Sequence, residues 1–471
     1  MEFELCFKTA DELSHLISSK QVSPVQVVEE HLRRIELLEP KLNSYISIMR
    51  DSALKQAKEH ESEILGGTYR GPLHGVPVAL KDIFYVTGVP NTYGSKINQD
   101  FVPHFNSTVV NKFADAGAIL IGKLNLHQFA FGPTGENHHY GDMHNPWDID
   151  SYAGGSSGGS GSAVAAGQAT IAMGSDTGGS IRIPSALCGI VGLKPTFGRV
   201  SKYGVSPLGW SLDHVGPMVR TVKDSALVLN AIAGYDQMDS CSVNRPVPDF
   251  TAGLSDGIEG IRVGVPKEYF DFPVHPQVKS SVDVALVQLE KLGAKIIDVD
   301  WPIFSYAFAI STVLLITEAS AGLSKLVMEK GPEFQPGTRL RVEGGMFYTA
   351  NDYLKAQRAR RLFVDQTREL MDKVDVLVGP MVPSGAPKIG QTEVDLGSKH
   401  QGIIPTLTQY TRAFNINGFP AMTLPCGFTD SNMPIGLQIA GRPWEEETVL
   451  KVGHAFEKAT DWHTKRPPAF S

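Results

Sequence analysis

Apolar residues recur at helical spacing in two segments at the start of the chain. A Thr9–Glu12 capping box precedes the first segment, and Ser23 followed by Pro24 begins the second. A stripe of apolar residues at every third or fourth position is the pattern of a helix with one buried face. The chain is therefore expected to open with two helices, whose apolar positions are Leu13, Leu16, Ile17, Val28, Leu32, Ile35 and Leu38.

Short apolar runs then alternate with helical patterns along the rest of the chain. The runs predict buried strands, and the helical patterns at Thr108–Ala116 and Val278–Leu292 are each followed by a glycine that can end a helix. This alternation is typical of an α/β fold with a largely parallel sheet. The predicted strands are Val76–Leu80, Ala118–Ile121, Ile171–Met173, Ile261–Val265, Lys295–Val299, Val374–Val378 and Ala421–Leu424.

The composition is that of a folded globular protein. Of the 471 residues, 42% are hydrophobic and 20% are charged, which supports a large core and excludes global disorder. The net charge is −7, and no basic run extends beyond Arg358, Arg360 and Arg361. A nucleic-acid-binding protein normally carries a basic patch, so no direct nucleic-acid partner is expected. The four cysteines are scattered without a CxxC pair, which predicts neither disulfides nor a zinc site.

The sequence predicts a cytoplasmic protein without a membrane segment. Its first 13 residues, MEFELCFKTADEL, lack the basic start and apolar centre of a signal peptide. The apolar stretch Pro302–Thr317 is shorter than the roughly 20 residues that a membrane span needs.

Two glycine-rich turns that carry serines are the strongest chemical signal. Residues 154–162 read GGSSGGSGS, and Asp176–Ser180 reads DTGGS, which places Ser156 and Ser180 24 residues apart. A flexible linker is the alternative for the first run. Short regular elements around both turns favour a site instead, because glycine lets backbone N–H groups approach a ligand and stabilise an oxyanion.

A serine nucleophile needs a base, and Lys81 is the candidate. No histidine is visibly placed for this role, whereas Lys81 directly follows the predicted strand Val76–Leu80. Ligands in open α/β sheets bind at the carboxyl ends of strands, and a lysine buried there loses its proton more readily. The alternative is a solvated lysine paired with Asp82, and the sequence leaves both possibilities open.

Three other sites are weighed and disfavoured. Gly117–Lys123 matches the spacing of a phosphate-binding loop, but Leu124 replaces the required Ser or Thr and the interior reads as a strand. Gly155–Gly159 matches GxSxG, which needs a strand directly before it, whereas residues 148–152 look polar and irregular. Four histidines lack a recognised metal-binding spacing and are expected at the surface or in loops. They are His127, His138, His139 and His144.

Long segments resemble, in the same order, the motifs of the amidase signature family of serine hydrolases. The resemblance covers about residues 8 to 467 and implies one large α/β domain over 1–471, with a mixed central sheet covered by helices on both faces. Within it, residues 1–65 would form N-terminal helices, 66–220 the signature core and 221–471 the rest of the sheet and the substrate pocket. The matching segments are GPLHGVPVALKD (71–82), AILIGKLNLHQFAF (118–131), GGSSGGS (154–160), GSDTGGSIRIPSALCGIVGLKPT (174–196), SLDHVGP (211–217) and PIGLQIAGRP (434–443).

The resemblance also implies the roles of site residues. Lys81, Ser156 and Ser180 match a catalytic triad, in which Ser156 follows a cis peptide bond and Ser180 is the nucleophile. The backbone amides of Thr177, Gly178, Gly179 and Ser180 match the oxyanion hole, and Ser157, Asp176 and Arg182 match supporting positions. The implied reaction is hydrolysis of a small-molecule amide through an acyl-enzyme, releasing ammonia or an amine, without a metal or an organic cofactor.

Two members of the family compete as the expected activity. One is a free-standing amidase acting on linear amides. The alternative is the A subunit of the glutamyl/aspartyl-tRNA amidotransferase, which makes ammonia from glutamine for a partner subunit. Thr408 and Ala413 stand where that subunit has an aspartate and a proline, and residues 311–313, upstream of Glu318, contain no tyrosine. The segment Asn125–Asp148 also resembles free-standing amidases, which are therefore the expected class.

Further features suggest the substrate and the assembly. Arg360 is matched to a carboxylate-binding arginine, with a helix-surface charge as the alternative. The apolar segment Trp301–Ile316 and the aromatic residues Phe129, Phe131 and Trp210 suggest an apolar or aryl acyl pocket, with core packing as the alternative. The N-terminal helices often form packing or dimer surfaces in such proteins, so a homodimer is possible.

Overall fold

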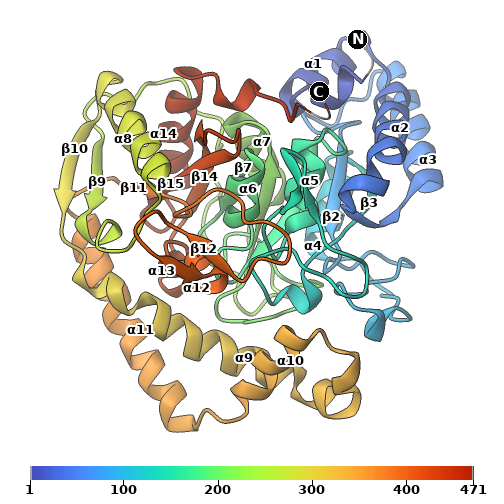
Figure 1. Cartoon of the computed structure of the whole chain (residues 1–471). Coiled ribbons are helices and arrows are strands. Elements are labelled where there is room, and N and C mark those ends of the chain that lie inside the picture. The colour runs from blue at the N-terminus through green and yellow to red at the C-terminus, as the bar shows by residue number, and fades with distance from the viewer. Residues whose placement is uncertain (1–2, 469, 471) are drawn as a thin grey trace.

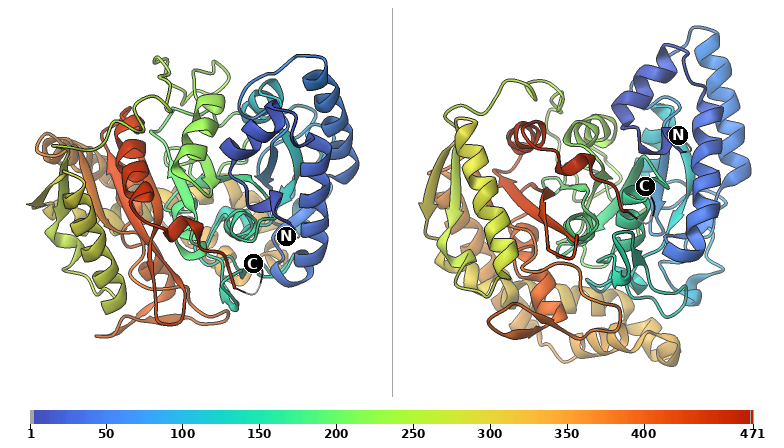
Figure 2. Two further views of the ribbon diagram at one scale, coloured as in Figure 1. Left: turned by 90° about the horizontal axis from the view of Figure 1, so that it is seen from above. Right: turned by 45° about the horizontal axis from the view of Figure 1, so that its top comes forward.

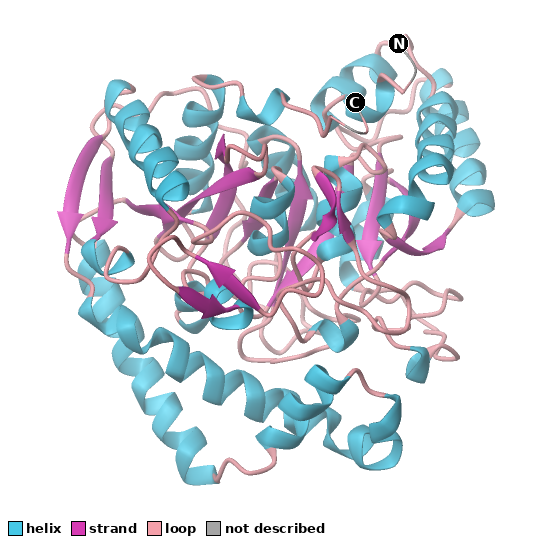
Figure 3. Cartoon of the chain, viewed as in Figure 1, coloured by secondary structure: helices cyan, strands magenta, loops and turns pink. Residues whose placement is uncertain are grey.

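A single mixed sheet runs through the whole molecule (Figures 1 and 3). The computed structural model describes residues 3–468 and 470, and over these residues the sheet has 11 strands. In spatial order they are β1 (Tyr45–Ile48), β3 (Ile119–Leu124), β2 (Pro77–Lys81), β6 (Ile171–Asp176), β8 (His214–Val219), β7 (Val191–Lys194), β14 (Ala421–Phe428), β15 (Pro434–Gly441), β11 (Val376–Pro380), β9 (Arg262–Pro266) and β10 (Lys295–Val299).

The predicted α/β fold with a mixed sheet is confirmed, but the expectation of a largely parallel sheet is wrong. Strand β2 runs parallel to both β3 and β6, and β9 runs parallel to β10 and β11. Every pairing from β6 through β8, β7, β14 and β15 to β11 is antiparallel. The strand–helix alternation breaks where β14 and β15 form a hairpin, because a short turn can join only antiparallel strands.

Helices cover both faces of the sheet (Figure 2). A Cβ atom on Gly436 of β15 would lie 2.5 Å from Ala186 of α6, whereas one on Gly441 would lie 2.6 Å from Val449 of α14. Positions an odd number apart on a strand face opposite sides, so α6 and α14 cover opposite faces. The helices of these two layers and of the N-terminal edge are α1 (Ala10–Ser18), α2 (Pro24–Leu42), α3 (Arg50–Leu65), α4 (Thr108–Asp115), α5 (Gly158–Ala165), α6 (Arg182–Cys188), α7 (Val222–Ile232), α8 (Pro276–Lys291) and α14 (Glu446–Lys458).

The two helices predicted at the start of the chain are confirmed with their caps. The Thr9 hydroxyl accepts the N–H of Glu12, and the Glu12 side chain accepts the N–H of Thr9. Ser23 caps α2 with Pro24 at its first position. These helices and α3 lie at the β1 end of the sheet, and both chain ends lie on this side (Figures 1 and 2).

A separate group of helices lies below one edge of the sheet (Figure 1). The apolar stretch at Pro302–Thr317 is longer than it looks in the sequence, because the helical segment continues to Glu333. By length and composition this segment could cross a membrane, but half of its apolar window is buried inside the molecule. The helices of this group are α9 (Ala307–Lys330), α10 (Pro336–Gly345) and α11 (Ala350–Met371). The short helices α12 (Ile403–Thr408) and α13 (Arg412–Ile416) lie above them in Figure 1, beside β12 (Glu393–Asp395).

Candidate active site

Four chain segments converge at the carboxyl ends of two neighbouring parallel strands. Lys81 is the last residue of β2, and Ser175 lies next to the end of β6, with which β2 pairs in parallel. Ser156 and Ser157 immediately precede helix α5, and Ser180 lies in the turn between β6 and α6. Because parallel strands end at the same edge, the sheet brings these side chains together there.

Lys81 is fully buried, and its amine contacts three serine hydroxyls. Its Nζ lies 2.7 Å from Ser156 Oγ, 3.0 Å from Ser157 Oγ and 2.9 Å from Ser175 Oγ. The alternative pairing with Asp82 is wrong, because the Asp82 carboxylate points to Lys123, 2.7 Å away, and accepts from Thr92. The polar contacts of Lys81 are therefore hydroxyl groups and not a carboxylate.

The surroundings of Lys81 favour its neutral form. Burial lowers the pKa of Lys81 to about 7, against the opposing effect of the negative charges of Asp213 and Asp176. The Ser157 hydroxyl donates to the Ser175 carbonyl at 3.3 Å, which leaves its oxygen to accept from Lys81. A neutral amine that donates its two hydrogens to Ser157 and Ser175 directs its lone pair at the Ser156 hydroxyl.

The backbone holds the serines close to one another. The peptide bond between Gly155 and Ser156 is cis, as the resemblance implied. The Ser156 carbonyl accepts the N–H of His127 at 3.1 Å, and the N–H of Ser157 donates to the Ser180 carbonyl at 3.3 Å. This last bond joins the turn before α5 to the turn that carries Ser180.

Asp176 organises the turn around Ser180. Its buried carboxylate accepts the N–H groups of Gly179 at 2.7 Å and Ile181 at 3.2 Å, and it pairs with Arg182 at 3.0 Å. Burial alone would raise the pKa of Asp176, but the Arg182 charge holds it well below its usual range. The N–H of Gly179 is thus turned toward Asp176, which leaves those of Thr177, Gly178 and Ser180 as candidate oxyanion donors.

Three residues that the sequence did not single out complete this arrangement. Ser175 contacts Lys81, and Asp213 accepts the Thr177 hydroxyl at 2.5 Å together with two backbone N–H groups. Asn415 donates to the Asp176 carboxylate at 2.8 Å and accepts from Arg182. Ser175 and Asp213 lie inside the matched segments. Because side chains alternate between the two faces of a strand, the position of Ser175 next to the end of its strand could have identified it. Nothing in the sequence links Asn415 to residues more than 200 positions away.

A small cavity of about 50 Å³ borders Ser180. Phe131 and Leu315 contribute to its walls, as expected for an apolar pocket, together with two arginines, Arg341 and Arg412. Phe129 and Trp301 are buried in the hydrophobic core and do not line this cavity.

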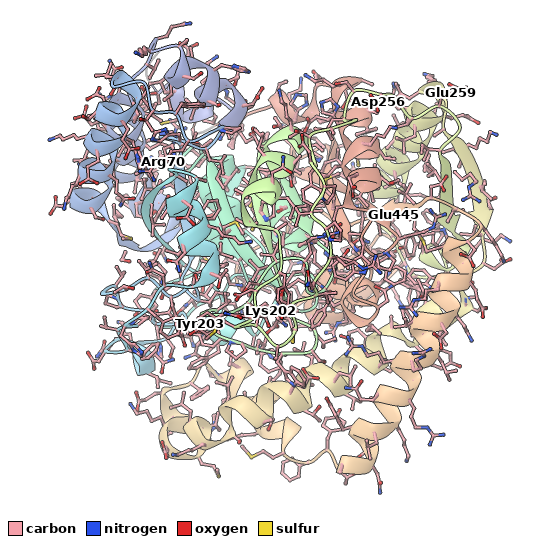
Figure 4. The ribbon with its side chains drawn as sticks, turned by 180° about the vertical axis from the view of Figure 1, so that it is seen from behind. Arg70, Lys202, Tyr203, Asp256, Glu259 and Glu445 are labelled. Carbon is pink, nitrogen blue, oxygen red and sulfur yellow. The ribbon has the colours of Figure 1, made fainter. Side chains whose placement is uncertain are left out.

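Trp210 does not line the Ser180 cavity. It is 58% exposed and borders a separate cavity beside Lys202 and Tyr203, which are labelled in the back view of Figure 4.

Arg360 does not reach the cavity either. Its guanidinium donates to the Ser211 hydroxyl and carbonyl, both at 3.0 Å, and to the Ile416 carbonyl at 2.7 Å. It is therefore neither a free surface charge nor a residue lining the pocket. Thr408 does line the cavity, and its hydroxyl accepts from Arg412 at 2.9 Å.

The alternatives to this site do not form. Residues 119–124 of the phosphate-loop match are strand β3, with Lys123 paired to Asp82. The residues before the GxSxG match, expected to be irregular, form strand β5 (Asp148–Tyr152). This strand pairs with β4 (His144–Asn145) and, at Ser151, with Lys388, outside the main sheet.

The four histidines weighed as metal ligands do not cluster among the described residues. The metal-like cluster found there is a different one, His60, Glu63 and His74, whose ligand atoms lie within 4.8 Å. His74 Nδ1 accepts the N–H of Arg70, so its Nε2 carries hydrogen. Arg70, which is labelled in Figure 4, pairs with Glu63. Hydrogen bonds and an ion pair account for this cluster without a metal ion.

Comparison with known proteins agrees with this architecture. The family model described as Amidase matches residues 26–450. The A subunit of glutamyl-tRNA(Gln) amidotransferase from Geobacter sp. (strain M21) is 40% identical, and the alignment covers 98% of this chain and 99% of that protein. An inhibitor-bound structure from a study of a vestigial protein complex and an s-triazine catabolic enzyme superposes with a TM-score of 0.93 at 34% identity, covering 96% of this chain and 98% of the other. The A subunit from Thermotoga maritima superposes with a TM-score of 0.82 at 32% identity, covering 97% and 95%. Together with the site described above, these matches show that the chain belongs to the amidase signature family of enzymes.

Proposed function

We propose that this protein is an amidase that hydrolyses a carboxamide C–N bond with Ser180 as nucleophile. The observation that carries the proposal is the buried amine of Lys81, 2.7 Å from the Ser156 hydroxyl and with a pKa of about 7. A lysine that is about half neutral at pH 7 is a usable general base, whereas an ordinary lysine is almost fully protonated there.

The proposed reaction begins with two proton transfers. Lys81 takes the proton of Ser156, Ser156 takes the proton of Ser180, and Ser180 Oγ attacks the amide carbonyl carbon. Thr177, Gly178 and Ser180 line the cavity, and in this proposal their N–H groups receive the developing oxyanion, where one such donor is worth about 3 kcal/mol.

The second half of the reaction releases the amine and then the acid. The C–N bond breaks as Ser156 returns a proton to the leaving nitrogen, because an unprotonated amine leaves poorly. Ammonia or an amine departs, and an ester to Ser180 remains. Water then attacks this ester by the same relay, which frees the carboxylic acid and restores the Ser180 hydroxyl.

The curated relatives favour a second candidate, glutamine hydrolysis within an amidotransferase. Relatives such as the Geobacter protein are named A subunits of glutamyl-tRNA(Gln) amidotransferase and align over nearly their full length. In this role the same serines and lysine would release ammonia from glutamine for a partner subunit. The two candidates share the chemistry and differ in the substrate and in the need for a partner.

A panel of amides tests both candidates. The purified chain is assayed for ammonia or amine release from glutamine, asparagine, aliphatic amides and anilides, beside the Ser180→Ala variant. Turnover by the chain alone that falls at least 1,000-fold in the variant is expected for an amidase. Glutamine turnover that requires the other amidotransferase subunits would establish the second candidate. Equal activity of Ser180→Ala and the native chain would rule out Ser180 as nucleophile.

A further inference from the structure

Two arginine side chains reach the cavity beside Ser180 from different elements. Arg412 is the first residue of α13, and its stem lies 4.0 Å from where a Cβ on Gly178 would be. Its Nε donates to Thr408 Oγ1 and one terminal nitrogen donates to Thr312 Oγ1, both at 2.9 Å. The guanidinium lies 4.3 Å from the centre of the Phe308 ring. These contacts hold Arg412 beside the turn that carries the proposed oxyanion donors.

Arg341 faces the same cavity from helix α10. One terminal nitrogen donates to the Phe131 carbonyl and lies 3.5 Å from His127 Nε2, while the guanidinium lies 4.9 Å from the centre of the Phe131 ring. Its buried Nε has no hydrogen-bond partner among the described residues. Arg341 is therefore held in place and still has an unused donor.

No carboxylate neutralises this pair. The residues that line the cavity include both arginines and no Asp or Glu, and the described part of the chain contains no acid within 4.0 Å of either guanidinium. Glu136 acts on Arg341 only from a longer distance. Two other buried arginines do have carboxylate partners, since Arg182 pairs with Asp176 and Arg199 pairs with Glu446.

The two positive charges also affect each other. Burial lowers the pKa of Arg412 to about 10, and the neighbouring charge of Arg341 contributes to the decrease. Burial likewise lowers the pKa of Arg341 to about 10. Both remain charged at neutral pH, so the cavity carries a positive potential that an anion would offset.

We propose that the substrate of this enzyme is an anionic carboxamide, whose carboxylate is bound by Arg412 and Arg341 while its amide reaches Ser180. This inference rests on the proposed amidase function and specifies its substrate class. Arginine is suited to the role because its planar donors match the two oxygens of a carboxylate. Monoamides of dicarboxylic acids are the simplest molecules with these two ends.

The same geometry disfavours glutamine. Glutamine carries an α-ammonium group beside its carboxylate, and that cation needs an anionic partner. Thr408 occupies the position where the resemblance called for an aspartate, and its hydroxyl binds Arg412 instead. Thr312, which lies in the segment 311–313 without a tyrosine, accepts from the same guanidinium. The cavity thus presents a cation where glutamine would require an anion.

The test compares an anionic and a neutral amide of similar length. Succinamate and pentanamide are assayed with the native protein, Arg412→Met, Arg341→Met and the control Arg360→Met, whose arginine is bound to Ser211 outside the cavity. We expect the native protein to prefer succinamate by at least 100-fold in kcat/KM. Each cavity variant should lose at least 30-fold on succinamate, mainly in KM, and less than 3-fold on pentanamide. Arg360→Met should keep the native ratio, and Arg412→Lys should recover part of it.

A binding measurement separates failure of this inference from failure of the proposed function. Succinate, the corresponding product, is titrated calorimetrically into the Ser180→Ala protein and into Ser180→Ala/Arg412→Met, with butanamide as the uncharged control. Binding of succinate that the second variant loses supports the inference even if no amide is hydrolysed. Equal binding of succinate and butanamide, a native preference for pentanamide, or equal losses on both amides would overturn it. Loss of all turnover in Ser180→Ala together with any of these results would overturn the substrate class and leave the amidase proposal intact.

Discussion

At the scale of single residues, the ionisation of one lysine determines how the site can work. Among the described residues, the groups within hydrogen-bond distance of the Lys81 amine are hydroxyls, while two carboxylates, Asp176 and Asp213, act on it from farther away. Burial lowers the pKa of Lys81 and the two carboxylates raise it, with a net value of about 7. Burial therefore has the largest effect on the pKa of Lys81, and the charges of the two more distant carboxylates partly oppose it.

The pH dependence of the reaction follows from this balance. Below pH 7 Lys81 is protonated and cannot accept the Ser156 proton, so kcat/KM should rise about tenfold per pH unit up to pH 7 and then level off. The profile is measured with succinamate or with the best amide of the panel. A rate independent of pH between 5 and 7 would contradict the assignment of Lys81 as base.

The variant Asp213→Asn extends this prediction. Asp213 raises the pKa of Lys81, so removing its charge should move the acid limb of the profile to lower pH. A purely structural effect of the substitution would reduce the plateau and leave the limb in place.

The sequence supplied most of these residues because they lie in contiguous matched segments. Lys81, Ser156, Ser157, Asp176, Ser180 and Arg182 all converge at one place in the structure. The hydrogen bond from the Gly179 N–H to the Asp176 carboxylate could not be predicted from the sequence, because the direction of a backbone N–H depends on the dihedral angle φ. That angle is +124° at Gly179, in the region that favours glycine.

At the scale of elements, a buried histidine couples helix α2 to the segment before β6. His31 Nδ1 donates to the Val27 carbonyl at 2.8 Å, and its Nε2 accepts from Thr170 Oγ1 at 3.0 Å. In the neutral imidazole, both ring nitrogens of His31 therefore make hydrogen bonds. Burial lowers the pKa of His31 to about 4.

Acid should therefore weaken the attachment of this helix. Between pH 6.5 and 4 the unfolded chain binds a proton at His31 that the folded protein does not, so folding stability falls as pH falls. The difference amounts to about 3 kcal/mol by pH 4. The urea midpoint of native protein and of His31→Gln, measured from pH 7 to pH 4, should converge or cross as pH falls. Parallel curves would contradict this role of His31.

Elements were predicted best where local signals suffice. The Thr9 and Ser23 caps, and β10 with both ends as predicted, depend on residues near in sequence. Strand direction depends on how the chain returns between strands, which apolar runs do not reveal. This is why alternation predicted a largely parallel sheet and the structure has an antiparallel centre.

At the scale of the molecule, Arg182 joins distant parts of the chain at the site. Beyond Asp176, it donates to Gln438 of β15 at 2.7 Å and to Asn415 of α13 at 2.8 Å. These partners are 256 and 233 positions away in the sequence. The turn around Ser180 is therefore tied to the C-terminal third of the chain.

Replacing Arg182 should loosen the whole protein and not only the turn. Arg182→Met leaves the buried Asp176 carboxylate without its cation, and breaking a buried pair in this way costs about 3–5 kcal/mol. Calorimetry should show a lower Tm for the entire transition. The double variant Arg182→Met/Asp176→Asn should recover part of the loss, and an unchanged Tm in the single variant would contradict this account.

The substrate cavity is also a property of the whole molecule. Its walls combine residues near position 131 with Ser180, Leu315, Arg341 and Arg412, which only the fold brings together. Pattern and resemblance identified the reacting groups, while the charge of the pocket became visible only when α10 and α13 were placed beside the turn. The resemblance therefore pointed to Arg360 as the carboxylate-binding arginine instead.

The small size of this cavity has a consequence for the kinetics of ligand binding. At about 50 Å³ it is far smaller than the roughly 300–1,000 Å³ of typical small-molecule sites. A ligand can enter only after lining side chains move apart, so binding takes place in two steps. In rapid-mixing experiments the observed association rate should therefore approach a plateau as ligand concentration rises, and the height of that plateau reports how fast the site opens.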